Sequence, residues 1–273
     1  MTREAELAYW IIERDNIRIR REAGQPPPWT KDPLMANVRY CNVRREDDKV
    51  TRYLADEWRS PTTPTYAIVA ARMINLIPTL QAMKRAELSH PGNAIAEWKR
   101  ACRQRQLDMK KVFTSAYTIS TCGQAMDKLD YVFDQVVSAV AEAGEPKFDS
   151  LASCHADLTR INGLGSFLAA QVVADLKNTP GHPLRTAPDW QTWAAPGPGS
   201  LRGLSAFYGA PIAPSGFDEG IAGSWEATRP LLPLELQDLH MQDFQNCLCE
   251  FSKYIRVKEG NGHVRNKYRP GGD

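Results

Sequence analysis

Helical periodicity is the feature of this sequence that most restricts the fold it can adopt. Apolar residues recur at steps of three and four along most of the chain, and the alternating pattern of β-strands is weak throughout. Segments with the helical pattern span residues 2–21, 47–59, 65–77, 94–113, 125–143, 151–160, 166–176 and 234–254. We therefore predict an all-α fold in which residues 1–273 form a single helical domain.

The composition is that of an ordinary globular protein. Of the 273 residues, 42% are hydrophobic and 24% are charged, so the chain can bury a large core without a metal or disulfide staple. Its uncharged apolar runs stay well short of the ~18–20 residues that cross a membrane. Charges interrupt residues 1–15, which therefore have no signal-peptide core. We expect a soluble chain that has no membrane partner and acts where it is made.

The cysteines do not show the spacing of a metal site. They are Cys41, Cys102, Cys122, Cys154, Cys247 and Cys249. Zinc sites and iron–sulfur clusters usually need C-x2-C pairs or a comparable set of ligands, and the sequence has neither. We predict six reduced thiols and no metal-binding residues.

The net charge of +2 is too small to identify a nucleic-acid-binding protein. Positive charge is nevertheless concentrated in residues 84–111, with eight basic and three acidic residues, and in residues 252–273, with six and two. The second segment includes a basic tail, residues 255–273. Each segment could face phosphates or could be an ordinary solvated surface.

A helical hairpin is predicted at residues 151–176, where two short helical segments flank the turn Asn-Gly-Leu-Gly. Glycines allow a tight turn, and the free N–H groups that begin the second helix favour a phosphate. The pattern resembles the helix–hairpin–helix of DNA glycosylases, with an apolar plug in the turn. The predicted DNA-binding residues are Gly163, Leu164, Gly165 and Ser166. The alternative is a plain structural turn between two helices.

Residues 178–233 are rich in glycine and proline, and we predict that they form a long active-site loop. In the glycosylase superfamily an aspartate shortly after the hairpin assists catalysis, and the candidate here is Asp189. Trp190 and Trp193 could stack on a base that has left the helix. In the alternative interpretation, Asp189 caps a helix and the two tryptophans belong to the core. The lysine of bifunctional glycosylases is missing, because its neighbourhood offers Ser166.

Two further segments could bind phosphate. Arg44 and Arg45 are followed by three acids, and paired guanidinium groups bind phosphates in a bidentate manner. The same residues could also be the charged first turn of a helix. Residues 197–204 form a glycine-rich segment that contains Arg202. It is not a Walker loop, since G-x4-G-K-[ST] does not occur in the chain, and this argues against P-loop phosphate transfer.

A third segment, residues 243–254, combines helical spacing with polar groups. The residues that can share one side of this helix are Asp243, Asn246, Glu250, Lys253 and Tyr254. Such a side could form the wall of an active site, or it could be a solvated outer face.

Together these segments resemble the bacteriophage amino acid:DNA transferases, formerly described as α-glutamyl/putrescinyl thymine pyrophosphorylases. The resemblance is carried by CNVRREDDKVTRYLADEWR, AYTISTCGQAMDKLDY, the hairpin, PGPGSLRGL and FQNCLCEFSKYIRV. The chain is also similar to the helical domain of phage 5-hydroxymethyluracil DNA kinases. The resemblance implies a DNA-glycosylase-like helical catalytic domain that works in the cytoplasm of the infected bacterial host.

The implied activity is hypermodification of thymine-derived bases in double-stranded phage DNA. A free amino acid, with glycine favoured, would be joined through its amine to the C5 methylene of 5-pyrophosphoryloxymethyl-deoxyuridine, with release of pyrophosphate and flipping of the base. Direct displacement and elimination followed by addition both remain open. The alternatives are a helix–hairpin–helix DNA glycosylase acting on a modified pyrimidine, and a non-catalytic DNA-binding module.

This chemistry assigns a role to each candidate residue. Asp189 and Glu250 are the candidate catalytic bases that would deprotonate the amine. The candidate pyrophosphate-binding residues are Arg44, Arg45, Arg202 and Lys253. The candidate substrate-binding residues are Asp47, Asp48, Tyr117, Lys128, Trp190, Asn246 and Tyr254. No cofactor is assigned, although a divalent cation could accompany the pyrophosphate.

Overall fold

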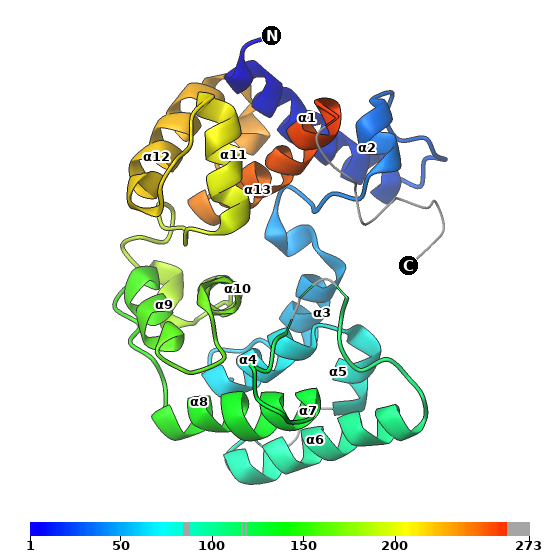
Figure 1. The fold of residues 1–273 in the computed structure, drawn as a ribbon, viewed down its shortest axis with the longest axis vertical. Coiled ribbons are helices and arrows are strands. Elements are labelled where there is room, and N and C mark those ends of the chain that lie inside the picture. Colours follow the sequence, from blue (N-terminus) through cyan, green and yellow to red (C-terminus); the bar gives the residue numbers. More distant parts are fainter. Residues whose placement is uncertain (84–87, 116, 118, 261–273) are drawn as a thin grey trace. The chain divides into compact units, whose positions relative to one another are not determined.

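The computed structural model describes residues 1–83, 88–115, 117 and 119–260 (Figure 1). The described residues form helices and turns without a β-strand, which confirms the predicted all-α class. The chain divides into two compact units. Unit 1 combines Met1–Asp48 with Pro196–Asp273, and unit 2 is Lys49–Ala195.

Unit 1 is built from helices at both ends of the chain. Its α-helices are α1 (Arg3–Glu22), α2 (Pro33–Asn37), α11 (Pro198–Tyr208), α12 (Phe217–Thr228) and α13 (Met241–Lys258). Its short 3-10 turns are η1 (Arg45–Asp47), η4 (Pro214–Gly216), η5 (Arg229–Leu231) and η6 (Leu234–Leu236). The apolar side of α1 packs against α11, α12 and α13, so the two ends of the sequence share one core.

The glycine-rich segment at residues 197–204 is part of a helix and not the loop that we predicted. Pro198 occupies the first turn of α11, where a missing N–H group has no cost. Gly199 and Gly203 face α13: a Cβ atom at Gly199 would lie 2.2 Å from Cys249 Sγ, and one at Gly203 would lie 2.2 Å from the Leu248 carbonyl oxygen. These glycines therefore let two helices approach closely. The segment 178–233 contains two full helices, α11 and α12, and is not one long loop.

Unit 2 is a helical body formed by the middle of the sequence. Its α-helices are α3 (Lys49–Glu57), α4 (Thr65–Ile74), α5 (Ile77–Met83), α6 (Pro91–Leu107), α7 (Lys128–Asp130), α8 (Ser138–Ala143), α9 (Leu151–Thr159) and α10 (Ser166–Lys177). A π-helical segment, η2 (Tyr131–Val137), joins α7 to α8, and η3 (Pro183–Thr186) follows α10. All ten residues of α4 are buried, as expected for a helix that is apolar on every side.

One buried residue of α4 is an arginine, and its charge is balanced inside unit 2. Arg72 donates through Nε and Nη2 to both carboxylate oxygens of Asp175, and through Nη1 to Asn75 Oδ1 at 3.0 Å. Arg59 lies 3.5 Å from the same carboxylate. This paired network explains how two arginines and an aspartate are accommodated in an apolar body.

The basic excess that we noted at residues 84–111 is partly neutralised. Lys99 pairs with Asp130 and Asp134 at 2.9 and 2.6 Å, and Arg103 pairs with Asp127 and Asp130 at 3.2 and 2.6 Å. These exposed pairs hold α6 beside α7 and η2. Lys110 also pairs with Asp108, at 3.0 Å. In the second basic segment, Lys253 pairs with Glu250 and Lys258 pairs with Glu6. The basic residues at 84 and 85 and those from 261 onward lie outside the described residues.

Candidate active site

In unit 1, the polar side of α13 holds the segment that contains the predicted arginine pair. Glu250 accepts a hydrogen bond from the Cys41 N–H at 3.1 Å, and Asn246 donates one to the Asn42 carbonyl at 3.2 Å. Asp243 accepts the Arg45 N–H at 2.9 Å. One helix face therefore bonds to three positions of residues 41–45, and the predicted polar side of α13 is an inner wall.

Arg14 completes this wall from α1. Its guanidinium donates to the Cys41 carbonyl at 2.9 Å and to Asn42 Oδ1 at 2.5 Å. Burial lowers the pKa of Arg14. The sequence analysis missed this residue, although a signal was available: Arg14 follows Leu7 and Trp10 on the apolar side of α1, where a charge needs a buried partner.

Glu250 and Lys253 form an ion pair on α13. Glu250 is 6% exposed, and Lys253 Nζ donates to its carboxylate at 2.8 Å. The lysine is more open to solvent, donates to the Arg39 carbonyl at 3.2 Å, and lies 5.2 Å from the ring centroid of Tyr40. Burial and the Glu250 charge raise the pKa of Tyr40, so the phenol stays protonated. A carboxylate and an ammonium group are thus fixed side by side.

Arg202 contributes positive charge to the same neighbourhood. It is exposed on α11, the helix whose Gly199 rests against Cys249. Burial raises the pKa of the Cys249 thiol, while the charges of Lys253 and Arg202 act against that shift. The thiol is therefore protonated and serves packing, whereas the two cations lie within electrostatic reach of one point on α13.

Most of the other predicted residues in unit 1 already have protein partners. Arg44 donates to the Glu235 carbonyl at 2.6 Å and pairs with Asp238, an interaction that lowers the pKa of that carboxyl. Asp47 lies in η1 and pairs with Arg18 at 3.1 Å. Asp48 is the residue that ends η1.

Tyr254 points toward the start of α2. Its hydroxyl donates to Asp32 Oδ2 at 2.9 Å, and Asp32 caps α2 through its other oxygen. The aspartate and the burial of the ring raise the pKa of Tyr254. The hydroxyl of Tyr254 thus has a protein partner in Asp32, and its contact with substrate stays a prediction.

Asp189 lies in unit 2, where it caps the first helix of the hairpin. Its carboxylate accepts the N–H groups of Leu151 and Ala152 at 2.8 and 3.0 Å, beside the capping box of Ser150 and Ser153. A carboxylate at a helix N-terminus is favoured by the helix dipole. These contacts are those of a helix cap, which was the alternative interpretation of Asp189.

Trp190 is tied to the end of α10. Its Nε1 donates to the Lys177 carbonyl at 3.1 Å, and Lys177 Nζ donates back to the Trp190 carbonyl at 3.0 Å. The buried ammonium also lies 4.6 Å from the indole centroid. Trp190 and Trp193 pack against the core of unit 2, as the alternative interpretation of these tryptophans required.

The helical hairpin is present, with α9 and α10 packed together across the turn at residues 160–165. Gly163 has a φ of +87°, and a Cβ atom there would lie 2.4 Å from the Tyr131 hydroxyl and 2.6 Å from Val136 Cγ2. Tyr131 and Val136 are five residues apart, a spacing that the π-helical geometry of η2 brings to one face. Leu164 is 1% exposed, which confirms the predicted plug.

The N-terminal side of α10 differs from the buried turn. Gly165 is the N-cap residue, and a Cβ atom there would meet open space. Ser166 begins the helix, and its carbonyl and hydroxyl lie 3.0 and 3.3 Å from His155 Nε2. This arrangement allows a phosphate to approach the first N–H groups of α10, although DNA binding by the hairpin remains a prediction.

Tyr117 and Lys128 also belong to unit 2. The Tyr117 hydroxyl donates to Gln171 Oε1 at 3.4 Å, and its ring meets that of Phe167 edge-on, with centroids 5.3 Å apart. Lys128 is the first residue of α7, and its Nζ lies 4.9 Å from the ring centroid of Phe113. Tyr117 therefore joins the hairpin surface.

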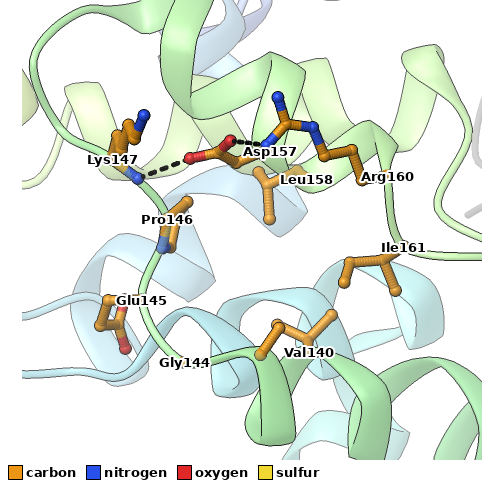
Figure 2. Close-up of a pocket in the computed structure, with 10 residues that line it drawn as sticks. Val140, Gly144, Glu145, Pro146, Lys147, Asp157, Leu158, Arg160 and Ile161 are labelled. Atoms are coloured by element: carbon orange, nitrogen blue, oxygen red, sulfur yellow. Dashed lines mark hydrogen bonds and ion pairs between the residues drawn. The ribbon is translucent and has the colours of Figure 1, made fainter.

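Figure 2 shows a hollow of about 360 Å³ where α8 and α9 end. Its lining residues are Val140, Ala143, Gly144, Glu145, Pro146, Lys147, Asp157, Leu158, Arg160 and Ile161. Asp157 accepts the Lys147 N–H at 3.0 Å and pairs with Arg160 at 2.9 Å, so its carboxylate ties the connecting segment to α9. Each sequence-predicted site residue lies outside this hollow.

The described part of the chain has neither a cluster of metal ligands nor a membrane-spanning helix. No group of three His, Cys, Asp or Glu side chains could hold a metal ion among those residues. None of the helices so described has the length and apolar character to cross a membrane.

Comparison with known proteins identifies the family of this chain. The chain belongs to the family defined by the helical domain of 5-hmdU DNA kinases, whose model matches residues 3–263. A 5-hmdU DNA kinase of Bacillus phage SP10 is 25% identical over 190 residues, which cover 61% of this chain and 30% of the relative. The chain thus spans less than a third of the curated relative that it matches. No solved structure is significantly similar.

The comparisons bear directly on the resemblances drawn from the sequence. The similarity to the helical domain of 5-hydroxymethyluracil DNA kinases is confirmed.

Proposed function

We propose that this chain is an amino acid:DNA transferase that hypermodifies bases in phage DNA. The amine of an amino acid, with glycine favoured, attacks the C5 methylene of 5-pyrophosphoryloxymethyl-deoxyuridine in double-stranded DNA. A carbon–nitrogen bond forms while the carbon–oxygen bond to the pyrophosphate breaks, and pyrophosphate leaves with the electron pair. Membership in a family named for a kinase of 5-hmdU DNA supports a substrate of this kind.

The observation that carries the proposal is the Glu250–Lys253 pair on the inner wall of α13. An amino acid is protonated at neutral pH, so its ammonium must give a proton to a base before it can attack. Glu250 is a buried carboxylate suited to that step. Lys253 and Arg202 supply positive charge to the departing pyrophosphate, and such stabilisation is usually a large catalytic effect.

The protein partners of the other candidate residues bear on their proposed roles. Asp189 caps α9, so we assign the role of base to Glu250 alone. Arg44 would have to exchange Asp238 for pyrophosphate, whereas Arg202 is already exposed. In unit 1, the pyrophosphate contact of Arg45 and the substrate contacts of Asp47, Asp48, Asn246 and Tyr254 stay predictions. In unit 2, the substrate contacts of Tyr117 and Lys128 stay predictions, and the bonds between Trp190 and Lys177 argue against that role for Trp190.

A direct test uses DNA that carries the pyrophosphorylated base and a panel of isotopically labelled amino acids. We expect nucleoside mass spectrometry to find a base bearing the amino acid, with one pyrophosphate released for each addition. Glu250→Gln preserves shape and hydrogen bonding to the Cys41 N–H but removes the base, so the rate of transfer should fall about 100-fold or more. Glu226→Gln, an exposed position on α12, is the matched control and should leave the rate unchanged.

Two results would reject this proposal in different ways. Abasic sites in place of the adduct would identify a glycosylase acting on a modified pyrimidine. Tight DNA binding without any covalent change, for every amino acid in the panel, would identify a DNA-binding module.

A further inference from the structure

The surface beside the hairpin turn carries an aromatic pair built from two segments. Phe167, the second residue of α10, is 56% exposed although it follows the buried Leu164 by three positions. The ring of Tyr117 contacts it edge-on, with an interplanar angle of 81°. An edge-on neighbour covers at most one face of a ring, so Tyr117 leaves Phe167 a face on which another flat group can stack.

The turn that presents Phe167 is rigid. Gly163 fits against Tyr131 and Val136 with no room for a Cβ atom, and Leu164 is inserted in the core. Tyr131 also donates to Cys122 Sγ at 3.2 Å, which links the turn to the segment that carries Tyr117. A preorganised aromatic side chain loses little conformational entropy on binding.

The charge around this surface favours a polyanion. The sequence between Asp108 and Asp127, which includes Tyr117, has no acidic residue and contains Lys110 and Lys111. The sequence between Asp157 and Asp175, which includes Phe167, also lacks acidic residues and contains Arg160. The Arg160 side chain is 76% exposed and pairs with Asp157 at 2.9 Å, and Lys110 pairs with Asp108 at 3.0 Å. Because exposed ion pairs are weak, each of these cations can exchange its carboxylate partner for a phosphate of a nucleic acid.

Gln171 adds a polar group on the same face. It lies one helical turn beyond Phe167 in α10 and accepts the Tyr117 hydroxyl. This bond holds the Tyr117 ring to the helix that carries Phe167 and helps to fix the aromatic pair.

We infer that Phe167, supported by Tyr117, is the stacking platform for an unpaired pyrimidine base of DNA. The inference rests on the proposed function for its DNA substrate and concerns the surface of unit 2 by itself. It moves the stacking role from Trp190, whose indole is fixed by Lys177, to a residue that the sequence analysis did not select.

Binding to labelled duplexes tests the inference without any transfer chemistry. One duplex carries a 5-hydroxymethyluracil opposite an abasic site, a second is fully paired, and a third has abasic sites on both strands at that position. Fluorescence anisotropy of the wild-type chain should show binding on the order of tenfold tighter to the first duplex than to the other two. Phe167→Ala should abolish this preference while its affinity for the paired duplex stays within about twofold.

Two further variants control for bulk and for surface change. Phe167→Trp keeps an aromatic face and should retain the preference. Leu107→Ala truncates an apolar side chain that is 72% exposed at the end of α6, and it should also retain the preference. Circular dichroism of each variant checks that the fold is intact.

The inference is overturned if the wild-type chain shows no preference for the unpaired pyrimidine, or if Phe167→Ala keeps it. Equal preference for the duplex with two abasic sites would also overturn it, because the chain would then recognise flexible DNA instead of a base. The transfer assay is a separate readout: discrimination without amino acid transfer would remove the proposed function and leave the platform standing.

Discussion

Two glycine-rich stretches of this chain look alike in sequence and do different work in the structure. At residues 163–165 in unit 2, Gly163 takes a positive φ in a turn between helices. In unit 1, Gly199 and Gly203 lie within α11 and let its backbone touch α13. The comparison teaches that a glycine spacing does not distinguish a turn from a close helix contact, because both require the absence of a Cβ atom.

The two stretches also differ in their exposure to solvent. In the hairpin, the exposed residues Gly165 and Ser166 directly follow the buried Leu164, so the turn ends at an exposed helix start. In α11 the glycines face a neighbouring helix and their surroundings are filled. An anion could approach the backbone of the first stretch, whereas the two glycines of the second stretch serve packing.

The largest effect expected from this comparison is at Gly203. A Cβ atom in Gly203→Ala would lie 2.2 Å from a carbonyl oxygen of α13, so the two helices must separate. We expect a loss of at least about 3 kcal/mol from the free energy of unfolding. Urea denaturation gives the total loss, and hydrogen exchange should locate it in α11 and α13.

Gly92→Ala is the control for this prediction. A Cβ atom at Gly92 in the first turn of α6 would meet open space, and alanine favours the helix. Its stability should be unchanged or slightly higher. Equal stability of Gly203→Ala and Gly92→Ala would refute the close contact between α11 and α13.

A somewhat smaller effect is expected at Gly163. Alanine there would adopt a φ near +87° and would also meet the Tyr131 hydroxyl and Val136. Side chains can move more easily than a helix backbone, so we expect a loss of about 2 to 3 kcal/mol. Hydrogen exchange should increase in α9, α10 and η2.

Gly165→Ala is the matched comparison for Gly163→Ala, since both positions lie in the same turn. Gly165 has a negative φ and open space at its Cβ position, so alanine should cost well under half as much as at Gly163. Comparable losses at the two positions would show that the turn as a whole, and not the fit of Gly163, decides stability.

The sequence predicted the helical class and the hairpin because both depend on local patterns. The spacing of apolar residues gave α1, α4 and α6, and the pair of glycines with Leu164 gave the turn between α9 and α10. It did not predict α11 or α12, since glycine and proline have low helix propensity when they are counted without their positions. Pro198 in a first turn and glycines on a packed face are compatible with a helix.

The site was harder to predict because a polar residue can serve a fold or a reaction. Three residues of the predicted side of α13, Asp243, Asn246 and Glu250, bond to residues 41–45. The partners of Arg44 and Asp189 were not predictable, since Asp238 and Leu151 are distant in sequence. The exposure of Phe167 depends on a tertiary turn, and no periodic pattern indicates it.

The smallest loss of unfolding free energy is expected at Asp189, which caps the first helix of the hairpin by accepting two N–H groups. Variants at this position also test whether its carboxylate has a role in transfer. Asp189→Ala removes this cap and should cost about 1 kcal/mol of unfolding free energy, since Ser150 still caps the same helix. Asp189→Asn keeps an acceptor oxygen and should cost less. Because Asn cannot act as a base, transfer activity that survives in Asp189→Asn but not in Glu250→Gln would separate the cap in unit 2 from the base in unit 1. Loss of transfer in Asp189→Asn at unchanged stability would instead show that the carboxylate has a chemical role beyond the cap.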